Sequence, residues 1–329
     1  NGYIGSIWNS SYIAISRCNN IISRLETASI SDSKKSQYKG EAMFVRAYCY
    51  FNLVRLFGAL PIVSTEFRSP NEVAAYDMSR KSVDEVYSLI VSDLTAASDL
   101  LANVSGLGKG RASAGAAKTL LGKVYLTLKQ YDKAATVLKS VIDLNQYSLV
   151  SNYKSLFTNN NDELAESIFE IKYLSGSVGE GNTFGCQLVP ALYGGMALFS
   201  GNQLGGGRLS PTADVVNSYE AGDLRKKASV SDSIPLAGGG VYRMLYGLKF
   251  VDFTAKDVND MDINFTALRY ADVLLMYAEV LNETGKTAEA HTYINMVRKR
   301  ARLAPLSKLV KVDFAVALEK ERRVEFLYE

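Results

Sequence analysis

The longest run of apolar positions lies between Gly40 and Val63, with the sequence GEAMFVRAYCYFNLVRLFGALPIV. When this run is wound as a helix, apolar side chains fall on every face, which is typical of a helix buried among others. Gly58 stands where a C-terminal cap is expected, and Pro61 prevents continuation of the helix. Interior polar residues such as Arg46 then need polar partners, because burying them alone would cost several kcal/mol.

Helical periodicity extends to both sides of this run. Residues 7–26 place apolar side chains on one face, and the polar residues 27–37 form a loop, so we expect an antiparallel helical pair. A connection follows over residues 64–82, and connections of this length are often functional. Ser82-x-x-Glu85 is a capping box that predicts the start of the next helix.

Two later segments share the spacing of a tetratricopeptide hairpin. Gly122 and Ala134 stand twelve residues apart, and Ala278 and Ala290 repeat the same step. Small residues at these positions let two helices approach closely. The repeat therefore indicates helical hairpins stacked side by side.

The boundaries of the second hairpin follow from local signals. Gly285 closes its first helix and Thr287 caps its second helix in this prediction. A further helix is expected over residues 313–329.

The material between the hairpins has another pattern. Residues 167–173 and 241–253 alternate as strands do, and residues 173–210 contain ten glycines. A short helix is expected from Ser210–Pro211 to Tyr219, because proline suits the first helical turn.

Together these patterns predict a mainly α fold of tetratricopeptide-like helical hairpins with an irregular insert of loops and short strands. We expect one domain, with helical hairpins over residues 1–145, the insert over 146–265 and a C-terminal helical repeat over 266–329. Neither end of the chain looks natural, since it begins at Asn1 and stops within a helical pattern. We interpret it as a fragment of a longer chain.

Composition narrows the function further. The chain has 329 residues, is 47% apolar and 22% charged, and carries a net charge of +3, which is ordinary for a globular protein and does not favour nucleic acid. His291 is the single histidine, and HExxH and GxSxG motifs are absent. The three cysteines form no CxxC motif, which favours free thiols. We therefore expect no enzymatic activity and no cofactor, and we assign no metal ligands, while a metal in the loop region stays open.

Two possible exceptions remain at this point. Residues 106–110 (GLGKG) superficially suggest a phosphate-binding loop, but no strand precedes them and the spacing is wrong. Two carboxylates that meet in space could still cleave a glycosidic bond, although the densest acidic positions alternate with arginine in helical patterns.

Three motifs of this chain resemble the SusD/RagB family of outer-membrane nutrient-binding lipoproteins. They are the helix GEAMFVRAYCYFNLVRLFGALPIV, the later LRYADVLLMYAEVLNETG with INMVRKRA, and the closing EKERRVEFLYE. They occur in the family's order, and Asp223-x-Arg225 after Tyr219 is similar too. The likeness covers roughly residues 1–155 and 265–329.

This resemblance implies a nutrient-binding role on the surface of a Gram-negative bacterium. It implies a lipid anchor on an N-terminal cysteine that this chain lacks, in the outer membrane. It also implies a partner, a TonB-dependent SusC-like transporter over which the protein closes like a lid. The usual cargo is an oligosaccharide, whereas relatives of RagB handle peptides. A tetratricopeptide scaffold that binds a partner protein in its concave groove is the other alternative.

A sugar-binding site needs an aromatic platform with a few fixed polar groups. The helical hairpins use their aromatic side chains internally, so we expect the platform to come from loops, with Trp8 near a helix start as a further candidate. The candidate ligand-binding residues are Trp8, Tyr76, Tyr193, Phe199, Asn202, Gln203, Arg208, Tyr242 and Tyr246.

Several charged residues lie on helices too apolar to leave them all in water. We expect several of them to pair across helices within hydrogen-bonding distance. They are Arg46, Arg269, Asp272, Glu279, Arg322, Arg323 and Glu325.

Overall fold

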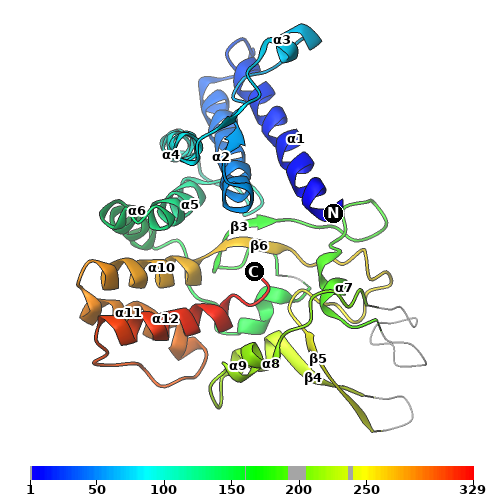
Figure 1. Cartoon of the computed structure of the whole chain (residues 1–329), viewed down its shortest axis with the longest axis vertical. Coiled ribbons are helices and arrows are strands. Elements are labelled where there is room, and N and C mark those ends of the chain that lie inside the picture. Colours follow the sequence, from blue (N-terminus) through cyan, green and yellow to red (C-terminus); the bar gives the residue numbers. More distant parts are fainter. Residues whose placement is uncertain (1, 160, 192–204, 236–239) are drawn as a thin grey trace. The chain divides into compact units, whose positions relative to one another are not determined.

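The computed structural model describes residues 2–159, 161–191, 205–235 and 240–329, which form two compact units, Asn1–Leu144 and Asn145–Glu329 (Figure 1). Helices dominate both units, and the short strands of the described ranges form two-stranded sheets. The predicted mainly α fold is therefore confirmed. Within the same ranges, no helix combines the length and the apolar character that crossing a membrane would require.

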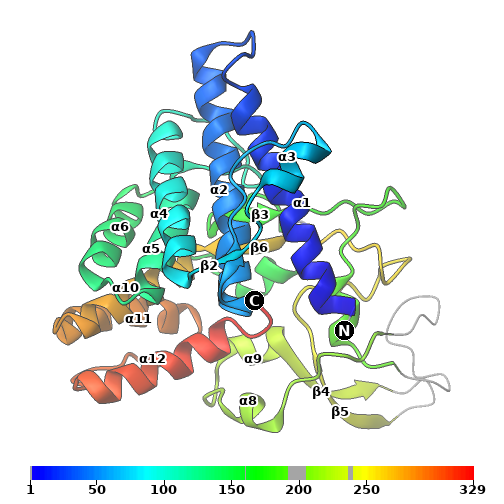
Figure 2. The ribbon, with the colours of Figure 1, turned by 45° about the horizontal axis from the view of Figure 1, so that its top comes forward.

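The first unit is built from helices that pack in chain order. Helix α1 packs on α2, α2 on α4, α4 on α5 and α5 on α6, and Figure 2 shows the long helices α1 and α2 side by side. The elements are α1 (Gly2–Arg24), α2 (Asp32–Phe57), β1 (Leu60–Pro61), α3 (Pro70–Ala75), β2 (Arg80–Lys81), α4 (Val83–Leu100), α5 (Ala114–Thr127) and α6 (Tyr131–Asp143).

Helix α2 is the central helix of this unit. Gly58 follows it with a φ of 70°, so the predicted cap is confirmed. The helix starts earlier than expected, at Asp32, because the Ser31 side chain accepts a hydrogen bond from the Lys34 amide. The predicted loop over residues 27–37 was therefore wrong in its second half, where polar residues form the first turns of α2.

Arg46 has the partners that its burial requires. Its Nε and Nη2 atoms donate to the Asp93 carboxylate of α4 at 2.8 and 2.7 Å, and Nη1 donates to Asn19 of α1 at 2.7 Å. Burial raises the pKa of Asp93 although Arg46 opposes the shift. This confirmed pair joins α2, α4 and α1 in the centre of the unit.

The connection after α2 contains more structure than its sequence suggested. Strands β1 and β2 pair antiparallel, so the two ends of the connection lie together, and helix α3 stands between them. Ser69 caps α3 by accepting from the Glu72 amide. The predicted capping box of Ser82 and Glu85 at the start of α4 is confirmed.

Helices α5 and α6 form the first predicted hairpin. A Cβ atom at Gly122 would lie 2.5 Å from Leu138 Cδ2, so only glycine allows this close approach. The buried Ala134 completes the contact.

The second unit combines a helical bundle with short strands. Helices α10, α11 and α12 pack on one another, strand β3 pairs antiparallel with β6, and β4 pairs antiparallel with β5. The elements are η1 (Tyr153–Phe157), β3 (Ser167–Ile171), α7 (Phe184–Leu188), α8 (Ala213–Asn217), α9 (Leu224–Ser229), β4 (Val230–Pro235), β5 (Val241–Gly247), β6 (Phe265–Arg269), α10 (Tyr270–Glu283), α11 (Thr287–Arg300) and α12 (Lys311–Glu325).

Helices α10 and α11 form the second predicted hairpin, with Ala278 and Ala290 fully buried. Gly285 has a φ of 80° and lies in the turn, as predicted. The predicted cap at Thr287 was wrong. Lys286 is the N-cap residue without a side-chain bond, and the Thr287 hydroxyl donates to Asn282 Oδ1 at 2.8 Å instead.

Two predictions for the insert, residues 146–265, were also wrong in their boundaries. Helix α8 starts later than expected because Thr212 caps it by accepting from the Val215 amide, which leaves Pro211 outside the helix. The predicted strand 241–253 ends at Gly247, where the pairing with β4 ends.

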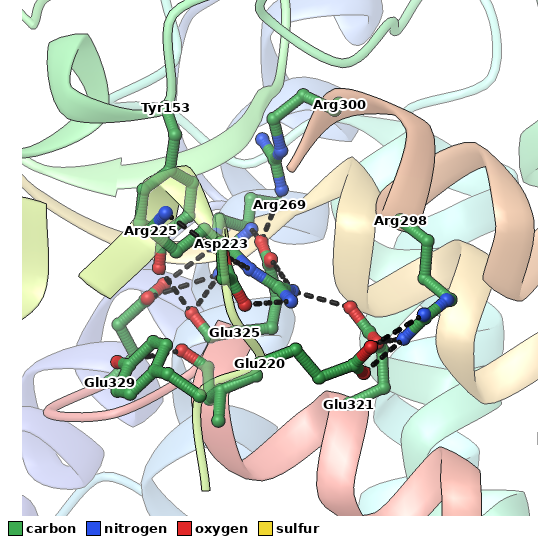
Figure 3. A network of polar contacts seen from close by, with 12 residues as sticks. Tyr153, Glu220, Asp223, Arg225, Arg269, Arg298, Arg300, Glu321, Glu325 and Glu329 are labelled. Carbon is green, nitrogen blue, oxygen red and sulfur yellow. Dashed lines mark hydrogen bonds and ion pairs between the residues drawn. The ribbon is translucent and has the colours of Figure 1, made fainter. Parts of the chain in front are cut away.

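A network of buried ion pairs occupies the centre of the second unit (Figure 3). Arg225 is 0% exposed and donates to both oxygens of Asp223 at 2.9 and 2.8 Å. Arg269 donates to Glu166 and Glu325 at 2.9 and 2.6 Å. Glu325 of α12 also accepts from Arg225 at 2.9 Å and pairs with Arg300.

These contacts confirm the predicted pairing of Arg269 and Glu325. Arg322 donates to Asp272 at 2.8 Å, which confirms a second pair. Glu279 is half-buried near Arg322, whose charge opposes the rise in the pKa of Glu279 that burial causes. Arg323 differs from the expectation, because its ion pair with Asp214 lies at the surface.

We expect Arg46→Ala to lower the free energy of unfolding by roughly 3–5 kcal/mol, because Asp93 would remain buried without its guanidinium partner. Urea denaturation measures this change. Lys139→Ala is the control, since Lys139 pairs with Asp143 on the surface, and such pairs contribute about 1 kcal/mol or less. Equal effects of the two substitutions would contradict the structural role of Arg46.

Lys249 should make the free energy of unfolding depend on pH in the alkaline range. Its Nζ donates to the Glu325 carbonyl at 2.9 Å and to Glu329 at 2.6 Å, and burial lowers its pKa from 10.5 to about 8. Between these two values the unfolded chain binds more protons than the folded chain. The unfolding free energy therefore rises with pH across this window, on the order of 1–3 kcal/mol relative to Lys249→Met. Urea denaturation at several pH values from 7 to 10.5 measures this change. If the free energies of unfolding of the original chain and of Lys249→Met changed in parallel with pH, the contribution of Lys249 would be disproved.

Candidate functional site

An aromatic hollow in the first unit is the strongest candidate for a ligand site. It lies between helix α1 and the connection that follows α2, and its volume is about 280 Å³. Trp8 and Tyr12 stand four residues apart on α1, so they share one face of the helix. Phe67 and Met78 contribute from the connection, and Ile15, Pro61 and Val63 add to the lining.

The rings of the hollow support one another. The ring centroids of Trp8 and Tyr12 lie 5.0 Å apart, and those of Trp8 and Phe57 lie 5.1 Å apart with the two rings nearly perpendicular. Phe67 rests on Tyr76 with centroids 5.1 Å apart. These separations are typical of favourable aromatic pairs. The platform is therefore held in place before any ligand arrives.

Tyrosine hydroxyl groups fix the connection to the helices. Tyr12 donates to the Pro61 carbonyl at 2.7 Å, and Tyr76 donates to the Ile62 carbonyl at 3.0 Å. Tyr50 accepts from the Val63 amide at 2.7 Å. Burial raises the pKa of Tyr12 to about 12, so its hydroxyl stays protonated at neutral pH. These hydroxyl groups are therefore engaged in contacts within the protein.

The charged groups around the hollow are also engaged. The Arg80 guanidinium lies 5.4 Å from the centroid of the Trp8 ring and donates to the Ala59 carbonyl at 2.7 Å. Glu66 binds Arg24 and Arg68, and the hydrogen bond from Arg24 is the main reason why its pKa is lowered. A general acid needs the opposite shift. The arrangement suits binding of a weakly polar ligand rather than acid–base chemistry.

The single histidine has a structural environment. His291 Nδ1 lies 2.8 Å from the Thr287 carbonyl, and Nε2 accepts from the Leu309 amide at 3.3 Å. Its ring packs on Phe314 with centroids 4.9 Å apart. Cys18, Cys49 and Cys186 are free thiols, and burial raises the pKa of each.

The predicted candidates occupy different environments. Trp8 lines the hollow and Tyr76 supports it from beneath Phe67, so the structure brings these two together. In the second unit, Tyr242 is 45% exposed on β5, while Tyr246 is 4% exposed and donates to the Ser233 carbonyl. Arg208 is exposed in a stretch without regular structure. Tyr193, Phe199, Asn202 and Gln203 lie outside the described residues.

Sequence reasoning missed part of the hollow. The pattern of residues 7–26 places Tyr12 only on the apolar face of the predicted helix, and the prediction for the connection does not single out Phe67 or Met78. The i, i+4 spacing of Trp8 and Tyr12 and the presence of Phe67 in a long connection were the available signals. Only the pairing of β1 with β2 brings Met78 to this site.

A second hollow of about 680 Å³ lies between α1 and α2. Its floor is apolar, with Ile13, Ile21 and Val45 among the lining residues. At its rim, Arg111 donates to Glu41 at 3.1 Å. This groove is larger than the aromatic hollow, and its apolar lining is the kind of surface that accepts apolar side chains of a peptide.

Comparisons with known proteins relate segments of both units to the same group of proteins. A family model described as starch-binding and associating with the outer membrane matches residues 1–126, and a model of the SusD family matches residues 228–329. SusD-like protein P2 of Formosa agariphila is 27% identical, and the alignment covers 100% of this chain and 70% of that protein. The chain spans 63 to 70% of the length of the curated relatives it matches.

Solved structures show the same similarity. A SusD superfamily protein from Parabacteroides distasonis matches with a TM-score of 0.85 and 28% identity, over 100% of this chain and 74% of that one. A laminarin-binding SusD-like protein matches with a TM-score of 0.83 and 29% identity, over 98% of this chain and 75% of that one.

Proposed function

The chain belongs to the SusD/RagB family, and from this premise we propose that it captures oligosaccharides at the cell surface. It then delivers them to a TonB-dependent SusC-like transporter in the outer membrane. In this proposal the protein is anchored to that membrane as a lipoprotein and binds its cargo without cleaving it.

The aromatic hollow of the first unit is the observation that carries this proposal. A sugar ring presents a face of C–H groups that stacks on an aromatic ring, together with a rim of hydroxyl groups. Trp8 and Phe67 offer such faces, and the exposed Ser16 lines the same hollow. The similarity to a laminarin-binding relative supports a glycan as the cargo.

The affinity of such a site should be modest. A hollow of about 280 Å³ can hold only part of an oligosaccharide. A protein that hands its cargo to a transporter must also release it. We therefore expect dissociation constants of µM to mM, or roughly −8 to −4 kcal/mol.

A peptide is the second candidate cargo, because the α1–α2 groove favours it. The groove is apolar along Ile13 and Ile21, and charges stand at its edge. A peptide that places apolar side chains along the groove would match this pattern.

Trp8 fluorescence tests the glycan site directly, because Trp8 is the only tryptophan in the chain. Titration with a panel of oligosaccharides that includes laminarin fragments should produce a saturable change in its emission. Calorimetry with the same ligand should show that Trp8→Ala weakens binding at least tenfold, as expected from losing about 1.5–3 kcal/mol of apolar burial at this side chain. Tyr38→Ala is the control, because Tyr38 lines the second hollow and not the aromatic one, and it should bind the glycan normally.

Two other outcomes would assign the binding site to different residues or a different cargo to the protein. Binding that is lost in Tyr193→Ala and Phe199→Ala but normal in Trp8→Ala would place the cargo on the glycine-rich segment. If Ile13→Glu abolishes binding of peptides and no glycan changes the Trp8 emission, the peptide function replaces the glycan function.

We expect no hydrolysis of a bound oligosaccharide. The described residues that line the hollow include no carboxylate, and Glu66, next to Phe67 in the sequence, has its pKa lowered by hydrogen bonds from two arginines. Incubation followed by an assay of reducing ends should show no increase above buffer. Steady turnover that a single Asp or Glu substitution abolishes would show instead that the protein is a glycosidase.

A further inference from the structure

Three carboxylates from two segments meet beside the β3–β6 sheet of the second unit. Asp162 and Glu163 belong to the loop before β3, and Glu170 belongs to β3 itself. One oxygen of each carboxylate lies within 4.8 Å of the others. No metal motif is apparent in the sequence here, because the loop and the strand approach each other only in the fold.

Glu170 is the unusual member of this group. It is 1% exposed, and neither of its carboxylate oxygens has a hydrogen-bond partner among the described residues. The hydroxyl groups of Ser167 and of Thr266, the residue opposite Glu170 on β6, are also buried there and have no hydrogen-bond partner in the part of the chain that the structure describes. A buried carboxylate without a partner is costly, so this position calls for a ligand that supplies positive charge.

The positive charge present at the cluster is on its solvent side. Lys172 Nζ lies 2.7 Å from Asp162 Oδ1 and 2.5 Å from Glu163 Oε1, and its side chain is 40% exposed. When all three carboxylates are ionised, one ammonium leaves an excess of two negative charges. Burial is the main reason why the pKa of Glu170 is raised, and the charges of Glu163 and Asp162 raise it further. The nearby Ser167 hydroxyl and Glu163 amide oppose this rise only in part.

The loop carboxylates are positioned by contacts outside the cluster. Asn264 Nδ2 donates to Asp162 Oδ1 at 3.1 Å, and the Tyr173 amide donates to Asn264 Oδ1 at 2.9 Å. Glu163 has a φ of 54°, a left-handed conformation that non-glycine residues adopt at some cost. The loop is thus held in a conformation that directs acidic side chains toward Glu170.

We propose that Asp162, Glu163 and Glu170 bind one calcium ion. The available donors are all oxygen atoms, which are the ligands of hard cations, and neither histidine nor cysteine takes part. Calcium accepts irregular geometry with six to eight oxygen ligands, whereas magnesium requires a near-ideal octahedron. A divalent ion matches the excess charge, and water completes its coordination on the exposed side. Lys172 then moves away from at least one of its two carboxylates.

Calcium titration of the whole chain tests this site. Calorimetry with CaCl₂ in a chelator-treated buffer should show one binding event, and the Tm should rise with calcium. Glu170→Gln keeps the shape of the side chain but removes its charge, and Asp162→Asn does the same at the exposed ligand. Each should weaken calcium binding at least tenfold. Asp232→Asn is the matched control, because Asp232 is an exposed carboxylate paired with Arg243, and it should bind as the original chain does.

The order of stabilities gives a second readout. In EGTA, Glu170→Gln should have the higher Tm, because it removes a buried charge that lacks a partner. In millimolar CaCl₂ the original chain should have the higher Tm, because only its site binds the ion. Absence of binding at millimolar calcium, or equal affinity in the original chain and Glu170→Gln, would overturn the proposal. A stronger response to magnesium than to calcium would overturn the choice of ion.

Discussion

Glu325 is a fully buried carboxylate that pairs with Arg225, Arg269 and Arg300, and the second unit depends on this interaction. Burial alone would raise the pKa of Glu325, yet the three guanidinium groups hold it well below its usual value. Removing water from so many charges is expensive, and only nearly complete pairing compensates for that cost. The network therefore specifies one arrangement of the segments that supply it, which are α9, β6, α11 and α12.

The first unit uses the same principle with fewer groups. Arg46 alone joins three helices through Asp93 and Asn19. The rest of that unit is organised by close apolar packing, as at Gly122 and Leu138. The connection that forms the aromatic hollow is then tied down by tyrosine hydroxyl groups. These polar atoms thus serve mainly to hold the structure, and the proposed sugar site consists mainly of aromatic and apolar side chains.

The acidic cluster at Glu170 contrasts with the Glu325 network. Both contain buried carboxylates, but Glu325 has three cationic partners, whereas the oxygens of Glu170 have none among the described residues. A network of charges in a low-dielectric interior is stable only when each member is satisfied. This difference is the reason why we assign a structural role to the Glu325 network and propose a cation site at Glu170.

The sequence by itself was enough to predict the long helices, the two hairpins and the resemblance to the family, although not every helix boundary. Local rules sufficed for the Gly58 cap, the capping box at Ser82 and the small residues at Ala278 and Ala290, because periodicity and caps depend on neighbouring residues. Local rules also indicated that Arg46 and Arg269 needed partners, but they did not identify Asp93 or Glu166.

Only the tertiary structure decided the sites. Trp8 and Phe67 are 59 positions apart in the sequence, and they line one hollow because β1 and β2 bring the ends of the connection together. Asp162 and Glu170 meet because the loop before β3 turns back on the strand. No pattern of neighbouring residues encodes such meetings, since they depend on how distant segments pack and on which polar groups that packing leaves without partners.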